Sequence, residues 1–185
     1  MKISGTKLSK AMEAAGTSPE ELAAALAEQG FSVTQAESAI RNWMRNNDHP
    51  RCRANHMAKM AQSLGIAAKD LAMFTSMVKG HRGSPRKAKL LTDLSRGKNV
   101  DQALNLLTFN TKRAAINVRK CLNAAIADAQ LAEAVETRLY VCESRVDGAT
   151  TIKRFQPKDR GRAHPIIKPL SHITVSVEER VRKSK

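Results

Sequence analysis

The sequence is poor in aromatic residues and in cysteine. Phe, Trp and Tyr make up only 3% of the 185 residues, which argues against a protein that stacks unpaired bases on a row of rings. The cysteines Cys52, Cys121 and Cys142 are odd in number and widely spaced, so they indicate neither a disulfide framework nor a zinc knuckle. Cys52 and His56 could share a helix face, but no second pair completes a metal site. We expect no metal and no other cofactor.

Long apolar runs and catalytic motifs are also missing. No apolar run approaches the roughly 20 residues that span a bilayer, and the amino terminus lacks the apolar core of a signal peptide. The sequence contains no P-loop, no nucleophile elbow and no cluster of acids able to hold magnesium. We therefore expect a cytoplasmic protein with no membrane partner and no enzymatic activity.

Positive charge is abundant and unevenly distributed. The chain has 32 Lys and Arg against 17 Asp and Glu, a net charge of +15. Met1 to Val78 holds nine cations against seven acids, a balance of +2, whereas Lys79 to Lys185 holds 23 against 10, a balance of +13. This distribution predicts that the second half of the chain binds a polyanion, and nucleic acid is the usual one.

The strongest signal is the segment from Lys153 to Lys168. It has no apolar face, and it carries one acid, Asp159, against six cations: Lys153, Arg154, Lys158, Arg160, Arg162 and Lys168. Gly161 suits a tight turn between its two halves. A two-stranded hairpin without a packed face is marginal in water. We therefore predict a basic hairpin, over about residues 150–172, that takes its final shape in contact with nucleic acid.

The second half otherwise predicts an α+β fold of three helices packed on a three-stranded antiparallel sheet, from which the hairpin extends. The first helix is expected over Pro85–Arg96, with Leu91 and Leu94 facing inward. The second helix should begin at Asn99, and the third should run from Thr111 to about Ala132. A strand is predicted over Leu139–Val146, followed by a turn at Asp147–Gly148. A half-buried strand is predicted over Ser171–Val177, with a solvated end at Glu178–Glu179.

The first half predicts an all-α domain of five short helices, with the domain limits at 1–78 and 79–185. Ser18 with Glu21, and Thr34 with Glu37, have the spacing of capping boxes. Helix ends are expected at Gly16, Gly30 and Gly65, and apolar stripes include Trp43 and the methionines Met57 and Met60; the last helix would carry Leu71, Phe74 and Val78.

Two stretches of the second half carry a resemblance to a known family. RGSPRKAKLLTDLSRGKNVDQALNLLTFNTKRAA, and then LYVCESRVDGATTIKRFQPKDRGRAHPIIKPLSHITVSVEE, resemble the bacterial large-subunit ribosomal protein twenty-two family, the tunnel-hairpin protein, over about Gly80 to Glu179. The resemblance implies a structural protein that binds large-subunit ribosomal RNA early in assembly and lines the polypeptide exit tunnel with its hairpin. Its implied partners are that RNA, neighbouring large-subunit proteins and the nascent polypeptide, and its implied location is the ribosome in the cytoplasm.

The expected RNA-binding residues follow from the resemblance and from the basic charge of the joint and the last helix. On the helical part they are Arg82, Ser84, Arg86, Lys87, Lys89, Arg96, Lys98, Lys112, Arg113, Asn117 and Lys120. On the hairpin and its base they are Lys153, Arg154, Lys158, Arg160, Gly161, Arg162, His164, Lys168, Ser171 and His172. Basic residues in the first turn of the helix that begins at Pro85 oppose the helix dipole, and a bound phosphate would compensate for this.

The first half resembles the helix-turn-helix domains of the phage-repressor type in EELAAALAEQG, AIRNWMRN and HMAKMAQSLGIAAKDL. The resemblance implies that the third helix directs five residues to bases: Gln35, Ser38, Arg41, Asn42 and Arg45. A charge of +2 is small for a DNA-binding domain, because phosphate contacts supply much of the affinity. A docking or RNA-contact module is the alternative for this half. For the whole chain, a DNA-binding transcriptional regulator and an RNA-processing enzyme are the alternatives to a ribosomal protein.

Overall fold

The computed structural model describes residues 1–27 and 31–180 and divides into two compact units. We call Met1–Phe74 the amino-terminal unit and Thr75–Arg180 the carboxy-terminal unit. The predicted domain limit between residues 78 and 79 lies within a strand, β2 (Ala72–His81), which begins in one unit and ends in the other. The helix end expected at Gly30 lies outside the described residues. Within the described ranges, no helix is long and apolar enough to cross a membrane.

The amino-terminal unit is mainly helical. Its elements are β1 (Lys2–Ile3), α1 (Gly5–Ala15), α2 (Pro19–Ala27), α3 (Val33–Met44), α4 (Ala54–Ser63) and α5 (Ala68–Leu71). The largest buried side chain is Trp43, whose indole N–H donates to the carbonyl of Pro50 at 2.7 Å. The predicted apolar stripes are confirmed on α2, α3 and α4, where Leu22, Ile40 and Met60 are completely buried. Burial of such side chains is the main force that holds these short helices together.

One predicted capping box is confirmed and the other is wrong. The Ser18 hydroxyl accepts from the N–H of Glu21 at 3.2 Å, and the Glu21 carboxylate accepts from the N–H of Ser18 at 3.0 Å. In α3 the box is formed by Ser32 and Gln35, not by Thr34 and Glu37. Helix α3 begins at Val33, so Thr34 is already inside the first turn, where its side chain cannot cap that turn.

The helix expected over Leu71, Phe74 and Val78 is wrong, because α5 ends at Leu71 and the chain continues as β2. The sequence AMFTSMV in β2 is rich in β-branched and aromatic residues, which fit a pleated surface. The strand also has partners on both sides: Ala72 pairs with Ile3 of β1, and the hydroxyl of Thr75 lies 3.0 Å from that of Ser176 on β4. The sheet therefore has four strands, in the order β1-β2-β4-β3, and not three.

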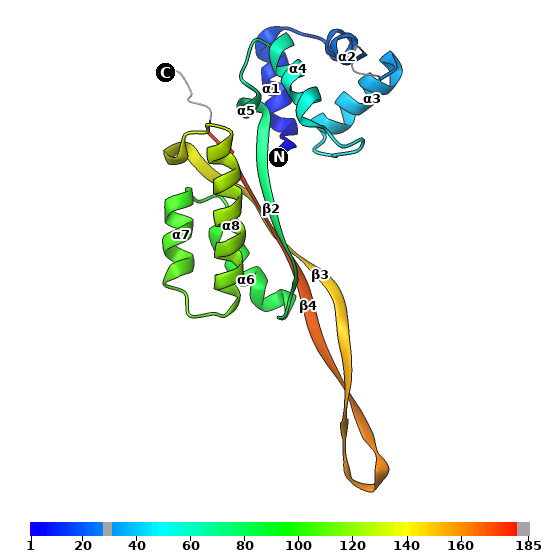
Figure 1. Cartoon of the computed structure of the whole chain (residues 1–185), viewed down its shortest axis with the longest axis vertical. Helices are drawn as coiled ribbons and strands as arrows, with labels where there is room; N and C mark the ends of the chain where they lie inside the picture. The colour runs from blue at the N-terminus through cyan, green and yellow to red at the C-terminus, as the bar shows by residue number, and fades with distance from the viewer. Residues whose placement is uncertain (28–30, 181–185) are drawn as a thin grey trace. The chain divides into compact units, whose positions relative to one another are not determined.

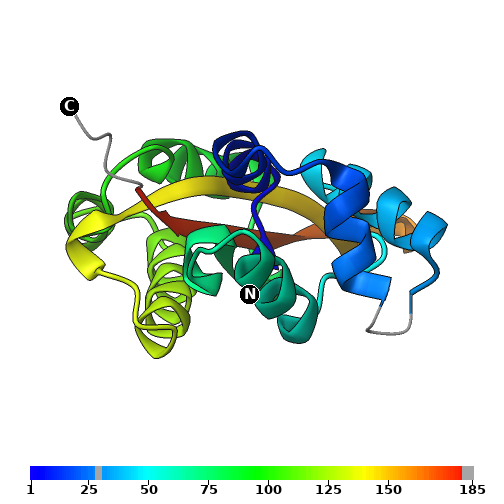
Figure 2. The ribbon, with the colours of Figure 1, turned by 90° about the horizontal axis from the view of Figure 1, so that it is seen from above.

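In the carboxy-terminal unit three helices pack against antiparallel strands (Figure 1). The elements after β2 are α6 (Pro85–Ser95), α7 (Val100–Thr108), α8 (Ala114–Leu131), a 3₁₀ turn (Glu136–Arg138), β3 (Leu139–Pro157), a second 3₁₀ turn (Asp159–Gly161) and β4 (Ala163–Glu179). Figure 2 shows β3, in yellow, and β4, in red, side by side in a curved ribbon. The apolar stripe predicted on α8 is confirmed by the burial of Val118, Leu122 and Ala125. Its first residue is Ala114 and not Thr111.

The turn expected at Asp147–Gly148 is wrong, because β3 runs through both residues. Asp147 pairs with His172 and Gly148 with Ser171, so the partner strand holds this dipeptide extended. Arg145 supports it through ion pairs with Glu143 at 3.2 Å and Asp147 at 3.6 Å. The register does shift between Ala149 and Ile152, opposite Pro169. Proline has no N–H to donate to the ladder, which accounts for an irregularity at this point.

Strand β4 is more buried than its alternation predicts. Thr174 and Ser176 alternate with apolar residues and would face solvent in the half-buried strand predicted over Ser171–Val177, but they are 2% and 0% exposed. Glu178 and Glu179, the predicted solvated end, are 5% and 8% exposed. The reason is that β4 is a central strand with neighbours on both sides. The two carboxylates are partnered there: Tyr140 donates to Glu178 at 3.1 Å, and Arg138 lies 3.7 Å from Glu179. Burial, and then the Glu178 charge, raise the pKa of Tyr140 to about 12.

Helix α6 buries a different face from the one predicted. Leu91 is buried as expected, but Leu94 is 37% exposed. The residues that face the sheet are Ala88, Leu91, Thr92 and Ser95, at the i, i+3, i+4, i+7 spacing of one helix face. The Ser95 hydroxyl lies 3.3 Å from that of Ser144 on β3, so this face combines apolar packing with a buried polar pair.

We call Lys153–Lys168 the arm. It is formed by the outer parts of β3 and β4, it extends beyond the helices of its unit (Figure 1), and all its residues are exposed. Its pairs run from Lys153 with Ile167 to Pro157 with Ala163. The turn expected at Gly161 is confirmed: Arg160 (φ 53°) and Gly161 (φ 70°) are both left-handed, and the N–H of Arg162 donates to Asp159 at 3.2 Å. Two successive left-handed residues are typical of a type I′ hairpin turn.

The capping of α3 can be tested with a pair of substitutions. We expect Ser32→Ala to lower the free energy of unfolding of the amino-terminal unit by about 1 kcal/mol, since it removes the cap. Thr34→Ala, the matched control, should change it by less than about 0.5 kcal/mol. Urea unfolding followed by fluorescence of Trp43, the only tryptophan, measures both variants. Equal effects of the two substitutions would contradict the assignment of Ser32 as the cap.

The exposure of the arm predicts uneven hydrogen exchange along β4. In the chain without nucleic acid, the amides of Ala163–Lys168 should exchange far faster than those of Ile173–Glu179, because water reaches both faces of the arm whereas the inner part is buried. Hydrogen–deuterium exchange with mass spectrometry measures both segments in one experiment. Similar protection of the two segments would show that the arm is stable by itself.

Candidate nucleic-acid interface

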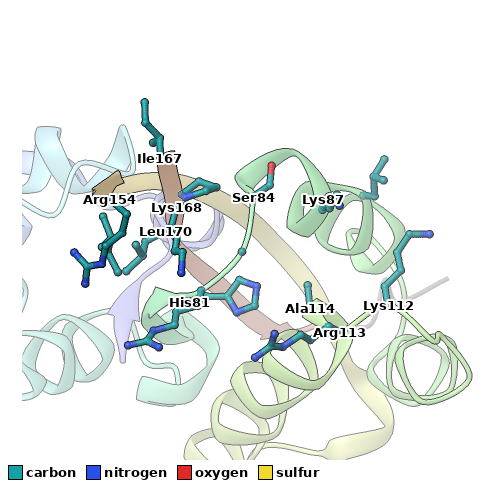
Figure 3. A pocket seen from close by; sticks show the side chains of 15 residues that line it. His81, Ser84, Lys87, Lys112, Arg113, Ala114, Arg154, Ile167, Lys168 and Leu170 are labelled. Carbon is teal, nitrogen blue, oxygen red and sulfur yellow. The ribbon is translucent and has the colours of Figure 1, made fainter. Parts of the chain in front are cut away.

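A groove in the carboxy-terminal unit brings three distant segments together (Figure 3). It has a volume of about 920 Å³. The three are the β2–α6 turn together with the first turns of α6, the segment between α7 and α8, and the base of the arm. Its lining residues include six cations: Arg82, Lys87, Lys112, Arg113, Arg154 and Lys168. We call this cavity the basic groove.

The turn from β2 into α6 shapes one wall of the basic groove. The N–H of Gly83 donates to the carbonyl of His81 at 2.9 Å, and a Cβ on Gly83 would lie only 2.5 Å from Nε2 of His81. A side chain at this position would require the His81 ring to move. The Ser171 hydroxyl donates to the carbonyl of Gly83 at 3.5 Å, which ties the turn to β4. The turn then leads directly to Ser84, the N-cap of α6.

His81 is a structural residue of the groove and not one of its charges. The ring is 7% exposed, and its Nδ1 accepts a hydrogen bond from the Asn117 amide on α8. Burial, and then the nearby charge of Arg113, lower the pKa of His81 below its ordinary value. The imidazole is therefore neutral at physiological pH, and it joins β2 to α8 without adding to the repulsion in the groove.

The charge of the basic groove is of one sign. None of its lining residues, all of which belong to the described part of the chain, is acidic. The ion pairs found among the described residues involve other cations, such as Arg96 with Asp93 and Arg145 with Glu143. Figure 3 shows Arg154 and Lys168 of the arm on one side and Lys87 and Lys112 on the other. The fold thus concentrates positive charge in a cavity where no protein carboxylate neutralises it.

The structure places seven of the predicted RNA-binding residues in this groove: Arg82, Ser84, Lys87, Lys112, Arg113, Arg154 and Lys168. Arg86 and Lys89 are exposed elsewhere on α6, and Lys98 and Lys120 are exposed outside the groove. The remaining arm residues are exposed along the strands and the tip: Lys153, Lys158, Arg160, Gly161, Arg162 and His164. The resemblance and the charge pattern predicted these residues, but they did not predict which of them share a cavity.

Four of the predicted residues outside the groove have side chains that are partnered or buried within the protein. Arg96 donates to the carbonyl of Ser144 through Nε at 3.2 Å and also through Nη2, and Asn117 donates to His81. His172 accepts from the N–H of Gly80 at 3.1 Å. Ser171 is fully buried. In the free chain these side chains hold the turn and the sheet that support the groove.

Sequence reasoning did not identify the apolar part of the lining, which includes Leu90, Ile152 and Leu170. Leu90 is 61% exposed. An apolar residue among basic neighbours in a sequence is most simply assigned to a core. The sequence pattern therefore did not indicate that Leu90 lines a cavity. Only the structure shows that Leu90 lies outside the buried face of α6, which comprises Ala88, Leu91, Thr92 and Ser95.

In the amino-terminal unit, four of the residues predicted to contact bases are exposed: Gln35, Ser38 and Arg41 on α3, and Arg45 directly after it. Asn42 is half-buried and donates to the carbonyl of His49 at 2.9 Å. The Arg41 guanidinium lies 3.7 Å from the Glu37 carboxylate, which reduces the net charge of this face.

The structure gives no geometric basis for a metal site at Cys52. The residue precedes α4, which begins at Ala54, so it does not share a helix face with His56 as the spacing allowed. Burial, and then the charge of Asp48, raise the pKa of Cys52 to about 12 and disfavour the thiolate that binds metals. Among residues 1–27 and 31–180, no three His, Cys, Asp or Glu side chains lie close enough together to hold a metal ion.

A comparison with protein-family models adds independent evidence on the carboxy-terminal unit. The model of ribosomal protein L22p/L17e matches residues 76–178, more than half of the chain. The match includes all the residues that line the basic groove and the complete arm. It does not include α1–α5 of the amino-terminal unit. The chain therefore belongs to the ribosomal protein L22p/L17e family, whose members generally have a structural role in the ribosome.

Proposed function

We propose that this protein binds large-subunit ribosomal RNA through the basic groove and the arm, takes part in early assembly of the subunit and lines the polypeptide exit tunnel with the arm. The observation that carries the proposal is the basic groove itself. Six cations from three segments converge there without an acid. The family supplies the ribosomal context, and the geometry of the groove supports RNA binding there.

Electrostatics favours a polyanion in this groove. Two like charges about 8 Å apart in water repel by roughly 0.5 kcal/mol, and the repulsion grows where solvent is partly excluded. Six such charges lower the stability of the free chain unless counterions collect around them. A nucleic-acid backbone replaces those counterions, and their release drives binding. The groove therefore fits a nucleic-acid backbone better than it fits a neutral protein surface.

The arm and the groove form one continuous surface, because Arg154 and Lys168 belong to both. Beyond them every residue of the arm is exposed, with three cations, Lys158, Arg160 and Arg162, against one acid, Asp159. A ribbon with no covering layer is stabilised when another molecule covers it. In the ribosome, RNA packed around the arm would supply this cover, and an arm enclosed in RNA would lie at the wall of the tunnel.

Early binding in assembly follows from the same geometry. An arm that RNA surrounds on several sides is difficult to insert after the RNA has folded. It is easier to place while the RNA domains are still open, so that RNA and arm fold together. We infer that this protein joins the growing subunit before the region around its arm closes.

A DNA-binding regulator is the alternative function, and no observation favours it. The exposed face of α3 and its C-cap offer only Arg41 and Arg45 as cations, and Arg41 is paired with Glu37. A repressor-type domain also depends on phosphate contacts for much of its affinity. In the ribosomal proposal, the amino-terminal unit is a module that contacts RNA or a neighbouring ribosomal protein.

Groove charge can be tested by neutralising two cations from different segments. Lys112→Gln with Arg154→Gln should weaken binding to a large-subunit ribosomal RNA transcript and reduce the slope of log affinity against log salt by about 1.5, because two phosphate contacts are lost. Lys10→Gln with Lys2→Gln, in the amino-terminal unit, removes the same charge and is the control. Filter binding at several salt concentrations measures both. An equal reduction of the slope in the two variants would mean that net charge, and not the groove, determines affinity.

The arm can be shortened without disturbing the body of the carboxy-terminal unit. We expect replacement of residues 157–163 by Asn-Gly, which joins the paired residues Gln156 and His164 by a two-residue turn, to leave the free energy of unfolding within about 0.5 kcal/mol of the wild-type value. The shortened protein should still enter large subunits, and cryo-electron microscopy of those subunits should show a wider tunnel at its position. An unchanged tunnel wall would contradict the proposed placement of the arm.

A further inference from the structure

The basic groove contains apolar surface that phosphate binding does not explain. Leu90 on α6, Ile152 at the base of the outgoing strand and Leu170 on the returning strand line it together with the six cations. Leu90 is 61% exposed, and Ile152 and Leu170 are half-buried. The Leu170 side chain lies 3.9 Å from where a Cβ on Gly80 would stand, so it packs over the end of β2. Exposed leucine in a basic cavity has a free-energy cost in water unless a ligand covers it.

The chemistry of this lining distinguishes between two forms of RNA. A regular A-form helix presents phosphates and riboses at its outer edge and keeps its bases stacked inside, so it would contact the cations and leave most of the apolar lining wet. An unpaired nucleotide that leaves the stack has an apolar base face and an anionic phosphate within a few ångströms of each other. The volume of the groove, about 920 Å³, lies in the range of roughly 300–1,000 Å³ typical of pockets that enclose small-molecule ligands.

We propose that the basic groove captures an unpaired nucleotide of the RNA, whose base lies against Leu90, Ile152 and Leu170 while the flanking phosphates contact the cations. The inference rests on the proposed function and specifies the form of RNA that the groove recognises. Lys112 and Arg113 on one side and Lys168 on the other can bind phosphates on both sides of the extruded base.

The same lining predicts little discrimination between bases. No aromatic residue lines the groove, and its uncharged polar side chains are limited to His81 and Ser84. The Nδ1 atom of His81 is already occupied by Asn117. A base held mainly by apolar contact is recognised as unpaired and not by its identity, because identification requires hydrogen bonds to the base edges.

The experiment uses the full chain and two RNA probes, a perfect 20-base-pair RNA duplex and the same duplex with one bulged adenosine. The wild-type protein should bind the bulged duplex roughly five- to ten-fold more tightly at equal salt, an effect of the size expected for covering a few tens of Å² of apolar surface. Leu90→Asn with Ile152→Thr should abolish this preference and leave both the affinity for the perfect duplex and the salt slope unchanged. A bulged uridine should bind within about three-fold of the adenosine.

The controls are two apolar residues of similar setting outside the groove lining. Leu106→Asn on α7 and Ile116→Thr on α8, which are 38% and 52% exposed, should keep the full preference. Circular dichroism of all variants shows whether each is folded; should Leu90→Asn with Ile152→Thr unfold, the more conservative Leu90→Gln and Ile152→Val, tested singly, replace it. Equal affinity of the wild-type protein for the two duplexes overturns the inference. An equal loss of affinity for both duplexes in a folded Leu90→Asn, Ile152→Thr variant also overturns the inference. It would mean that Leu90 and Ile152 support the packing of the groove and do not contact a base.

Failure of the inference is distinguishable from failure of the proposed function. If the protein binds the large-subunit transcript with the salt slope that depends on Lys112 and Arg154 but shows no preference for the bulge, only the captured nucleotide is wrong. If it binds neither the transcript nor the duplexes, RNA binding itself is wrong. If the groove variant loses affinity for a ribosomal protein and for no RNA, the apolar lining is a protein docking site and the inference is overturned.

Discussion

Mutual repulsion among the cations of the basic groove is the constraint on which the carboxy-terminal unit depends. The fold holds six such side chains at one cavity and provides no carboxylate beside them. It tolerates them because the structure beneath is strongly determined: Val118, Leu122 and Ala125 of α8 are buried, and so are Ile173, Val175 and Val177 of β4. Stability generated in the core thus maintains a surface that is unfavourable until a polyanion covers it.

Strand β4 links these two parts. From Ile173 to Glu179 it is a central strand whose polar side chains are also buried, and it includes Ser176, which contacts the Thr75 hydroxyl on β2. Toward its amino-terminal end the same strand passes Leu170 and Lys168 at the groove and then becomes one side of the exposed arm. The direction of the arm is therefore set by pairs inside the core, whereas its outer part has only β3 as a partner. A rigid base with an uncovered end suits an element that completes its environment by binding.

Most of the fold could be predicted from local signals, and the errors have physical causes. Charge and turn residues located the arm and its Gly161 turn, because neither depends on tertiary packing. The helix expected at Phe74 and Val78 was wrong because strand β2 is selected by its neighbours β1 and β4, which are distant in sequence. The turn expected at Asp147–Gly148 was wrong for the same reason, since pairing with His172 and Ser171 overrides a local turn preference.

The groove shows why site residues are harder to predict than site chemistry. Lys87, Lys112 and Arg154 were expected to bind RNA, but their meeting in one cavity depends on how α6, α8 and the arm pack around the turn at Gly83. Leu90 was missed because hydrophobicity at a helix position predicts burial, and only the observed buried face of α6 shows that it points elsewhere. Apolar and cationic groups that share a cavity complement the two parts of a nucleotide, which are its base and its phosphate. A duplex edge satisfies only the cations, whereas an extruded nucleotide satisfies both, and this difference in covered surface favours recognition of irregular RNA at the groove.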